Sequence, residues 1–177
     1  VVGDRIEREF VEPMNRGQAE RLLPMLTEMM SEVDLSWSDI DVIGVMTGPG
    51  NFTGVRIGVA AARGLAMATG KPAIGVTGFD VCAFETSGPV RIALEDARGG
   101  VFEQSFQDGA ACSEIGPATK DEVKPSIIPL SPAIVARISL HRAERLSTPT
   151  APPAPLYLRA ADATPSKTPI PQMIDDA

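Results

Sequence analysis

Histidine is almost missing from this chain, since His141 is the only one among 177 residues. A zinc peptidase needs several His or carboxylate ligands at a fixed spacing, and a serine or cysteine hydrolase needs a His base beside its nucleophile. A single His next to Arg142 is more typical of a solvated side chain than of a metal ligand. The sequence therefore predicts no catalytic residues, no metal site and no peptidase activity.

Cysteine and long apolar runs are also scarce. Cys82 and Cys112 lie far apart and lack CxxC spacing, which favours two free thiols in a reducing compartment and leaves a disulfide as the alternative. No apolar run approaches the roughly 20 residues of a membrane helix, and the chain opens on no basic leader with an apolar core. We expect a cytoplasmic protein that makes no contact with a membrane.

Basic charge is low and unevenly placed in this chain of net charge −7. The first 47 residues carry four basic and ten acidic side chains, whereas residues 48–72 carry Arg56, Arg63, Lys71 and no acid. A domain that binds RNA by itself normally has a basic face, so we do not expect this chain to bind RNA on its own. The basic segment suits either an acidic partner surface or a phosphate.

The most informative segment joins an expected strand to an expected helix. An apolar run at 40–46 predicts a buried strand, and a helix of small residues is expected at 54–69. The glycines between them permit positive φ, and the hydroxyl of Thr53 suits a helix cap. This junction could bind phosphate at the helix N-terminus, but the Walker pattern GxxxxGK[ST] is absent, so we favour a plain connection. The residues expected to shape the loop are Gly48, Pro49, Gly50, Thr53 and Gly54.

The same segment carries a family resemblance. GPGNFTGVRIG at 48–58 is similar to the GPGSFTGLRIG signature of the TsaB (YeaZ) family, the non-catalytic partners in bacterial tRNA threonylcarbamoyladenosine synthesis. Where the family's first-helix motif commonly has His, this chain has Gln18. Supporting segments follow in the family's order: GQAERLLPML at 17–26, GKPAIGVT at 70–77, DAR at 96–98 and PLYLR at 155–159.

The resemblance implies an α/β protein with the actin-like ATPase fold, in which two ribonuclease-H-like lobes stand in tandem. The order of expected elements agrees. It is a hairpin ending at residue 11, a helix at 18–33, a strand at 73–77, a hairpin at 90–106 and a helix at 134–146. Because of Pro24, either regular helix starts near Leu22 or the first turn is kinked. We expect an α/β lobe at 1–88 that bears the docking helices, a smaller lobe at 89–146, and a Pro-rich tail, extended or disordered, at 147–177. Because the chain begins in mid-pattern, the family's first strand is expected to be missing from it.

The resemblance also implies a docking surface. TsaB-like proteins use their first two helices to bind the catalytic homologue TsaD, or to form a homodimer when alone, and an ATPase, TsaE, joins the complex. Small residues let helices approach closely and Met adapts to its partner, although packing on the protein's own sheet is the alternative. Arg56 opposes the helix dipole, which favours a partner carboxylate over a merely solubilising charge. The expected interface residues are Leu22, Met25, Leu26, Met29, Arg56, Ala60, Ala61 and Gly64.

A function of another class stays open, a self-sufficient nucleotide-binding phosphotransferase or hydrolase of the same fold. Such an enzyme needs carboxylates for Mg²⁺ and glycine-rich loops in both halves of the chain. Asp96 is the only carboxylate that follows a strand in a suggestive setting, and its plainer role is to fix a hairpin turn together with Arg98. A second glycine-rich loop is absent. We expect no cofactor, and a loop at 48–54 that directs the helix toward the partner without holding ATP phosphates.

Overall fold

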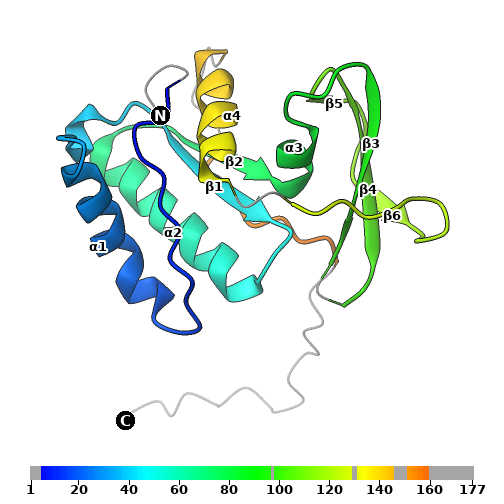
Figure 1. Cartoon of the computed structure of the whole chain (residues 1–177), viewed down its shortest axis with the longest axis horizontal. Coiled ribbons are helices and arrows are strands. Elements are labelled where there is room, and N and C mark those ends of the chain that lie inside the picture. The colour runs from blue at the N-terminus through cyan, green and yellow to red at the C-terminus, as the bar shows by residue number, and fades with distance from the viewer. Residues whose placement is uncertain (1–4, 97, 129–130, 146–150, 160–177) are drawn as a thin grey trace, which may run out of the picture.

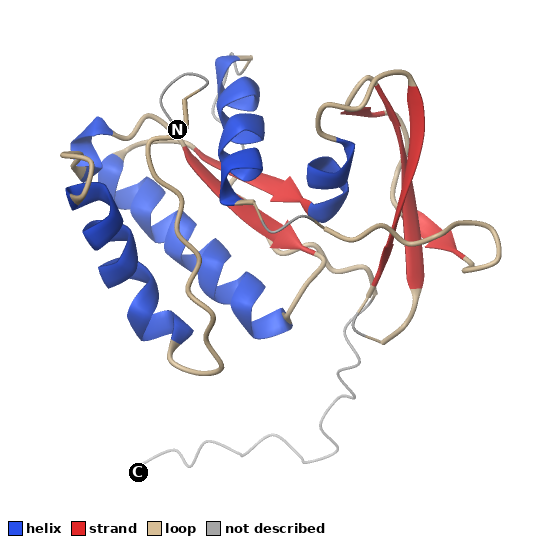
Figure 2. Cartoon of the chain, viewed as in Figure 1, coloured by secondary structure: helices blue, strands red, loops and turns tan. Residues whose placement is uncertain are grey.

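The structure is a computed structural model that describes residues 5–96, 98–128, 131–145 and 151–159 (Figure 1). Helices and strands alternate as far as residue 83, and an antiparallel sheet follows (Figure 2). The helices are α1 (Gln18–Ser31), α2 (Phe52–Thr69), α3 (Gly78–Ala83) and α4 (Pro132–Glu144), with a short 3-10 helix at Trp37–Asp39. The strands are β1 (Ile43–Gly48), β2 (Ala73–Thr77), β3 (Pro89–Glu95), β4 (Val101–Gln107), β5 (Ala110–Ala111) and β6 (Gly116–Ala118). None of the described helices is both long and apolar enough to span a membrane.

A parallel pair of strands forms the centre of the first half. β1 and β2 pair from Ile43 with Ala73 to Gly48 with Thr77, with an irregularity after Met46. Helix α2 packs on one side of this pair and α4 on the other, while α1 lies outside α2 (Figure 1). The apolar residues of the two sides form separate clusters: Val45, Val59, Ala62 and Ala73 under α2, and Val76, Val81 and Ile138 under α4.

Helix α4 approaches β1 unusually closely at Gly44. A Cβ atom on this glycine would contact the Ser139 hydroxyl and would lie 3.2 Å from the Val135 carbonyl oxygen. Ser139 is fully buried and its hydroxyl donates to the same Val135 oxygen at 2.8 Å. The absence of a side chain at Gly44 therefore sets the distance between helix and sheet.

The second half is a four-stranded antiparallel sheet. Strands β3 and β4 pair along their whole length, and β5 and β6 both pair with β4. Helix α3 covers this sheet with Phe79, which is fully buried beside Leu94 and Phe106. The expected hairpin at 90–106 is therefore confirmed, as are the expected strand at 73–77 and the late helix.

Several predicted boundaries were wrong. Helix α2 begins at Phe52 and β1 ends at Gly48, so the connection between them is shorter than the sequence suggests. Helix α1 already begins at Gln18 and contains Pro24, so the alternative of a regular helix that starts near Leu22 is wrong. The strand expected at 5–11 does not form: apart from a bridge at Arg5, the segment is irregular. Charged side chains in and just after this segment pair with α1 and its C-cap instead, Arg8 with the C-cap Glu32 and Glu12 with Arg21. The expected turn at 3–4 lies outside the described residues.

The first described part of the predicted tail, residues 151–159, is an ordered part of the fold. The Leu156 N–H donates to the carbonyl of Thr47 at 2.8 Å, which fixes the segment at the end of β1. Leu156 and Leu158 pack against the apolar cluster under α3, and Pro153 is buried. Of the two alternatives expected for the tail, extended or disordered, disorder is wrong here because alternate apolar residues pack on the core. The rest of the predicted tail, at 147–150 and 160–177, lies outside the described residues.

Candidate functional site

The loop between β1 and α2 is held by a different residue from the one predicted. Asn51 is the N-cap of α2, and its side-chain oxygen accepts the Gly54 N–H at 2.9 Å. The prediction of Thr53 as the cap is wrong, because Thr53 already lies inside the helix. Gly48 has a positive φ of 113°, which explains the need for glycine there, whereas Gly50 adopts no such conformation.

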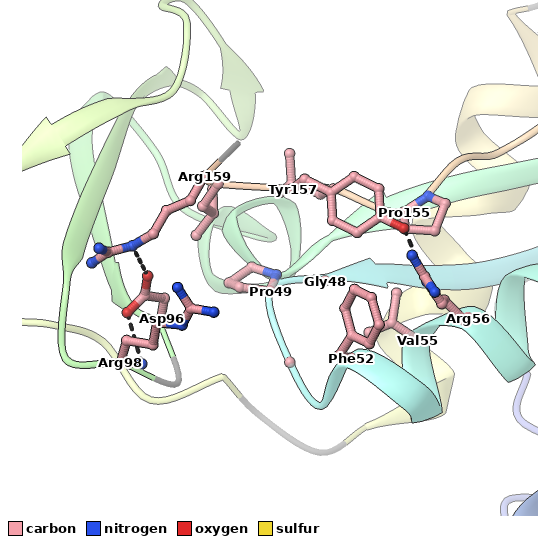
Figure 3. A pocket seen from close by; sticks show the side chains of 13 residues that line it. Gly48, Pro49, Phe52, Val55, Arg56, Asp96, Arg98, Pro155, Tyr157 and Arg159 are labelled. Atoms are coloured by element: carbon pink, nitrogen blue, oxygen red, sulfur yellow. Dashed lines mark hydrogen bonds and ion pairs between the residues drawn. The ribbon is translucent and has the colours of Figure 1, made fainter. Parts of the chain in front are cut away.

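A cavity of about 830 Å³ opens beside this loop, between three segments distant in the sequence (Figure 3). Its walls come from the loop and first turn of α2, from the turn after β3, and from the late segment at 155–159. They carry three arginines, one carboxylate and two exposed aromatic rings. The lining residues are Gly48, Pro49, Gly50, Phe52, Val55, Arg56, Asp96, Arg98, Pro155, Leu156, Tyr157, Leu158 and Arg159.

Arg56 is held between the two aromatic rings. Its guanidinium carbon lies 3.8 Å from the centre of the Phe52 ring, and its Nε–H donates to the Tyr157 hydroxyl at 3.1 Å. The two rings have their centres 6.1 Å apart, and Figure 3 shows Arg56 directed at Tyr157 across the mouth of the cavity. Cation–π contact and a hydrogen bond together fix an otherwise exposed side chain.

Asp96 closes the opposite wall of the cavity. Its Oδ1 accepts the N–H groups of Arg98 and Gly100, at 2.9 and 2.8 Å, and its Oδ2 accepts Arg159 Nε at 2.6 Å. Partial burial on its own raises the pKa of this carboxyl, but the hydrogen bonds from Gly100, Arg159 and Arg98 and the charge of Arg159 outweigh it and lower the pKa. The predicted role of Asp96 in fixing the hairpin turn is confirmed, and the ion pair with Arg159 is an addition.

The cavity offers groups that can bind a ligand. Its single carboxylate, Asp96, already accepts three hydrogen bonds from the protein's own groups, one of them from the charged Arg159. His141 lies on the exposed side of α4 beside Phe84. Within the described ranges, no group of three His, Cys, Asp or Glu side chains could hold a metal ion. Cys82 and Cys112 are free thiols, and burial raises the pKa of Cys82.

The predicted interface residues divide between exposed and partly covered positions. On α2, Ala60 and Gly64 are exposed with Arg56, while Ala61 is half-buried and Ala62 faces the sheet. The apolar stripe of α1 is partly covered because α1 packs beside α2. Its predicted members are all half-buried: Leu22, Met25, Leu26 and Met29.

Sequence reasoning gave no role to three exposed side chains at this site. Met67 is 86% exposed, Phe52 56% and Tyr157 54%. The spacing of Phe52 and Arg56, four residues apart on one helix, was a local signal of their contact. Met67 follows Ala60 and Gly64 on the exposed face of α2, so helical periodicity could have found it as well.

Comparisons with known proteins agree with the resemblance. Residues 12–100 match the family described as "TsaD: tRNA N6-adenosine threonylcarbamoyltransferase". An uncharacterized protein of Mycobacterium tuberculosis is 30% identical over 181 residues, which cover 93% of this chain and 83% of that protein. The Escherichia coli K12 "tRNA threonylcarbamoyladenosine biosynthesis protein TsaB" is 35% identical over 118 residues, covering 64% of this chain and about half (51%) of the relative.

The chain belongs to the TsaB (YeaZ) family. Its fold is that of a Pseudomonas aeruginosa crystal structure described as similar to peptidase YeaZ, with a TM-score of 0.65 at 21% identity. That match covers 84% of this chain and 87% of the other.

Proposed function

We propose that this TsaB-family chain is the non-catalytic subunit of the bacterial tRNA threonylcarbamoyladenosine machinery, and that it binds and activates a TsaD-like catalytic homologue. The observation that carries the proposal is the exposed face of α2, where Ala60 and Gly64 would allow a partner helix to approach closely. Met67 adds adaptable apolar area to this face. The site offers binding groups, with its one carboxylate already engaged, which suits a subunit without chemistry of its own.

We also propose that the fold divides into two lobes of the actin-like type. The parallel pair with α1, α2 and α4 would form one lobe, and the antiparallel sheet the other. The proposed boundary lies near residue 88, between α3 and β3, and the ordered late segment bridges both parts through Thr47 and Asp96. In this arrangement both docking helices, α1 and α2, belong to the first lobe, so the partner would contact that lobe.

An accessory subunit controls a rate by stabilising one conformation of its partner, because binding energy shifts the equilibrium toward the state that binds better. A TsaE-like ATPase would join the pair, and the same helices would support a homodimer when the partner is absent. The net charge of −7 argues that this chain meets tRNA through the complex and not alone. We place the complex in the cytoplasm, where tRNA is found.

A second candidate is a self-sufficient nucleotide-binding enzyme. The observation in its favour is the cavity, whose 830 Å³ falls within the roughly 300–1,000 Å³ of small-molecule sites. The hydrogen bonds that Asp96 already accepts weigh against this candidate, because Asp96 would have to break its contact with Arg159 before it could bind Mg²⁺.

Reconstitution separates the two candidates. The full chain and the TsaD-like protein of the same organism are co-purified, and modified tRNA is measured with each protein alone and with both, in the presence of a TsaE-like ATPase and the threonylcarbamoyl-adenylate donor. The proposal expects a stable heterodimer and modification only when both are present. Modification with the TsaD-like protein alone at an equal rate, or hydrolysis of ATP by this chain alone, would overturn it.

A further inference from the structure

The side chain of Arg56 is fixed in a conformation that leaves it able to bind a group outside the chain. Its Nε is used by Tyr157 and one face of its guanidinium lies on Phe52. The two terminal amino groups of the guanidinium make no hydrogen bond with any described residue, so the fork that matches a carboxylate is left available. A guanidinium already fixed in one conformation loses little side-chain entropy when it binds.

The charge of Arg56 is also uncompensated. Most other arginines of the described chain have a carboxylate within 4 Å, for example Arg142 with Asp80 and Arg159 with Asp96. Arg56 has none among the described residues, and no acid occurs between residues 48 and 72. Two exposed aromatic rings therefore hold a charge that no carboxylate of the described residues pairs with.

The position of Arg56 adds nothing to the stability of α2. It is the fifth residue of α2, close to the positive end of the helix dipole, where a cation gains no stabilisation from the dipole. Four-residue steps from Arg56 lead to Ala60 and Gly64, so the arginine stands at one end of the exposed face proposed to dock the partner. A helix laid along this face would end next to the guanidinium, at the mouth of the cavity.

We propose that Arg56, held by Phe52 and Tyr157, is the anchor that receives an Asp or Glu carboxylate from the partner subunit docked on α2. This inference rests on the proposed function and names the chemistry of the contact. Arginine and aromatic residues are the side chains that most often dominate binding energy at protein interfaces, particularly where water is excluded. Covering Phe52 and Tyr157 by the partner would remove water from the ion pair and strengthen it.

The test measures the dissociation constant between the full chain and the TsaD-like protein by isothermal titration calorimetry. Arg56→Gln is expected to weaken binding about ten- to a hundred-fold, because it leaves the partner's carboxylate unpaired. Arg56→Lys keeps the charge but loses the fork and the Tyr157 contact, and is expected to recover only part of the affinity. Arg145→Gln removes the same charge from the exposed end of α4, on the other side of the sheet, and should leave the constant within about two-fold.

The outcomes separate this inference from the function on which it rests. If the wild-type chain does not bind the TsaD-like protein, the proposed function fails. If the wild type binds and Arg56→Gln binds equally well, only the anchor is overturned. Circular dichroism shows whether each variant is folded. Titration of ATP into the isolated chain is the last control, since saturable binding that Arg56→Gln abolishes would assign the arginine to a phosphate and overturn the carboxylate anchor.

Discussion

The backbone N–H of Leu156 donates to the carbonyl oxygen of Thr47 at 2.8 Å, and so joins the late segment to the end of the strand that precedes the family signature. Thr47 is only 5% exposed, so its carbonyl has little access to water in the folded chain. The segment that carries Tyr157 and Arg159 is thereby placed over the cavity, where the Arg56–Tyr157 hydrogen bond and the Arg159–Asp96 ion pair also hold it.

This relationship predicts different effects for two substitutions at one position. Leu156→Ala removes apolar packing, whereas Leu156→Pro removes packing and also the donated N–H. We expect the proline variant to be less stable than the alanine variant by about 1–3 kcal/mol, the cost of a buried unpaired carbonyl. Urea unfolding measures both, and equal stabilities would show that the hydrogen bond contributes nothing.

Gly44→Ala should destabilise the protein, because the new Cβ would meet the Ser139 hydroxyl and push α4 off the sheet. Overpacking of this kind costs about 1–3 kcal/mol. Gly64→Ala is the matched control: no atom lies within 4 Å of its added Cβ, and alanine in a helix interior should stabilise by about 0.5–1 kcal/mol. Thermal unfolding of both variants checks whether the first lowers and the second raises the stability of the protein. An increase in stability for Gly44→Ala would contradict the close packing.

Asn51→Ala should lower the free energy of unfolding by about 0.5–2 kcal/mol, the usual value of an N-cap. Its oxygen accepts the Gly54 N–H, a donor that otherwise has no partner in the first turn. Thr53→Ala should have a much smaller effect, because no hydrogen bond of the Thr53 hydroxyl is present among the described contacts. If chemical denaturation shows that Thr53→Ala loses more free energy of unfolding than Asn51→Ala, then Thr53 is the cap and this account is wrong.

The lowered pKa of Asp96 predicts a dependence of stability on pH. A carboxyl whose pKa is lower in the folded state stabilises the protein above its unfolded pKa, near 3.9, and loses that contribution as the pH falls through the folded value. Asp96→Asn should therefore be less stable than the wild type at pH 7, and the difference should narrow below about pH 4. Arg159→Gln keeps the backbone N–H groups that donate to Asp96, so its stability at pH 7 should lie between those of the wild type and Asp96→Asn. A difference that stays constant from pH 7 to 3 would contradict this account.

Ala60→Arg and Ala62→Arg should separate docking from folding. Ala60 is exposed, so its variant should fold and bind the TsaD-like protein at least ten-fold more weakly if a helix packs there. Ala62 is buried against the sheet, so a charge there should unfold the chain, at a cost of several kcal/mol. Sedimentation shows whether each variant binds the TsaD-like protein, and circular dichroism shows whether it is folded. Normal binding by a folded Ala60→Arg variant would exclude this face of α2 as the interface.

Local patterns in the sequence determined the elements near the signature. The apolar run before Gly48 and the small-residue periodicity after it were enough to predict a buried strand and a helix, because both periods are set by backbone geometry alone. The turn at Asp96 was predicted for the same reason, since the carboxylate reaches the N–H groups of Arg98 and Gly100 within one hairpin.

Only the tertiary structure decided which of these residues act together. Asn51 and Thr53 are both chemically able to cap a helix, and the backbone path out of β1 selected Asn51. Tyr157 comes from a segment that the sequence places in an extended or disordered tail, and it meets Arg56 because Leu156 is bound to Thr47. The sequence by itself determined the helix, the strand and the turn; the cavity and the fixed arginine exist only because distant segments are packed against each other, and such contacts leave no local pattern to read.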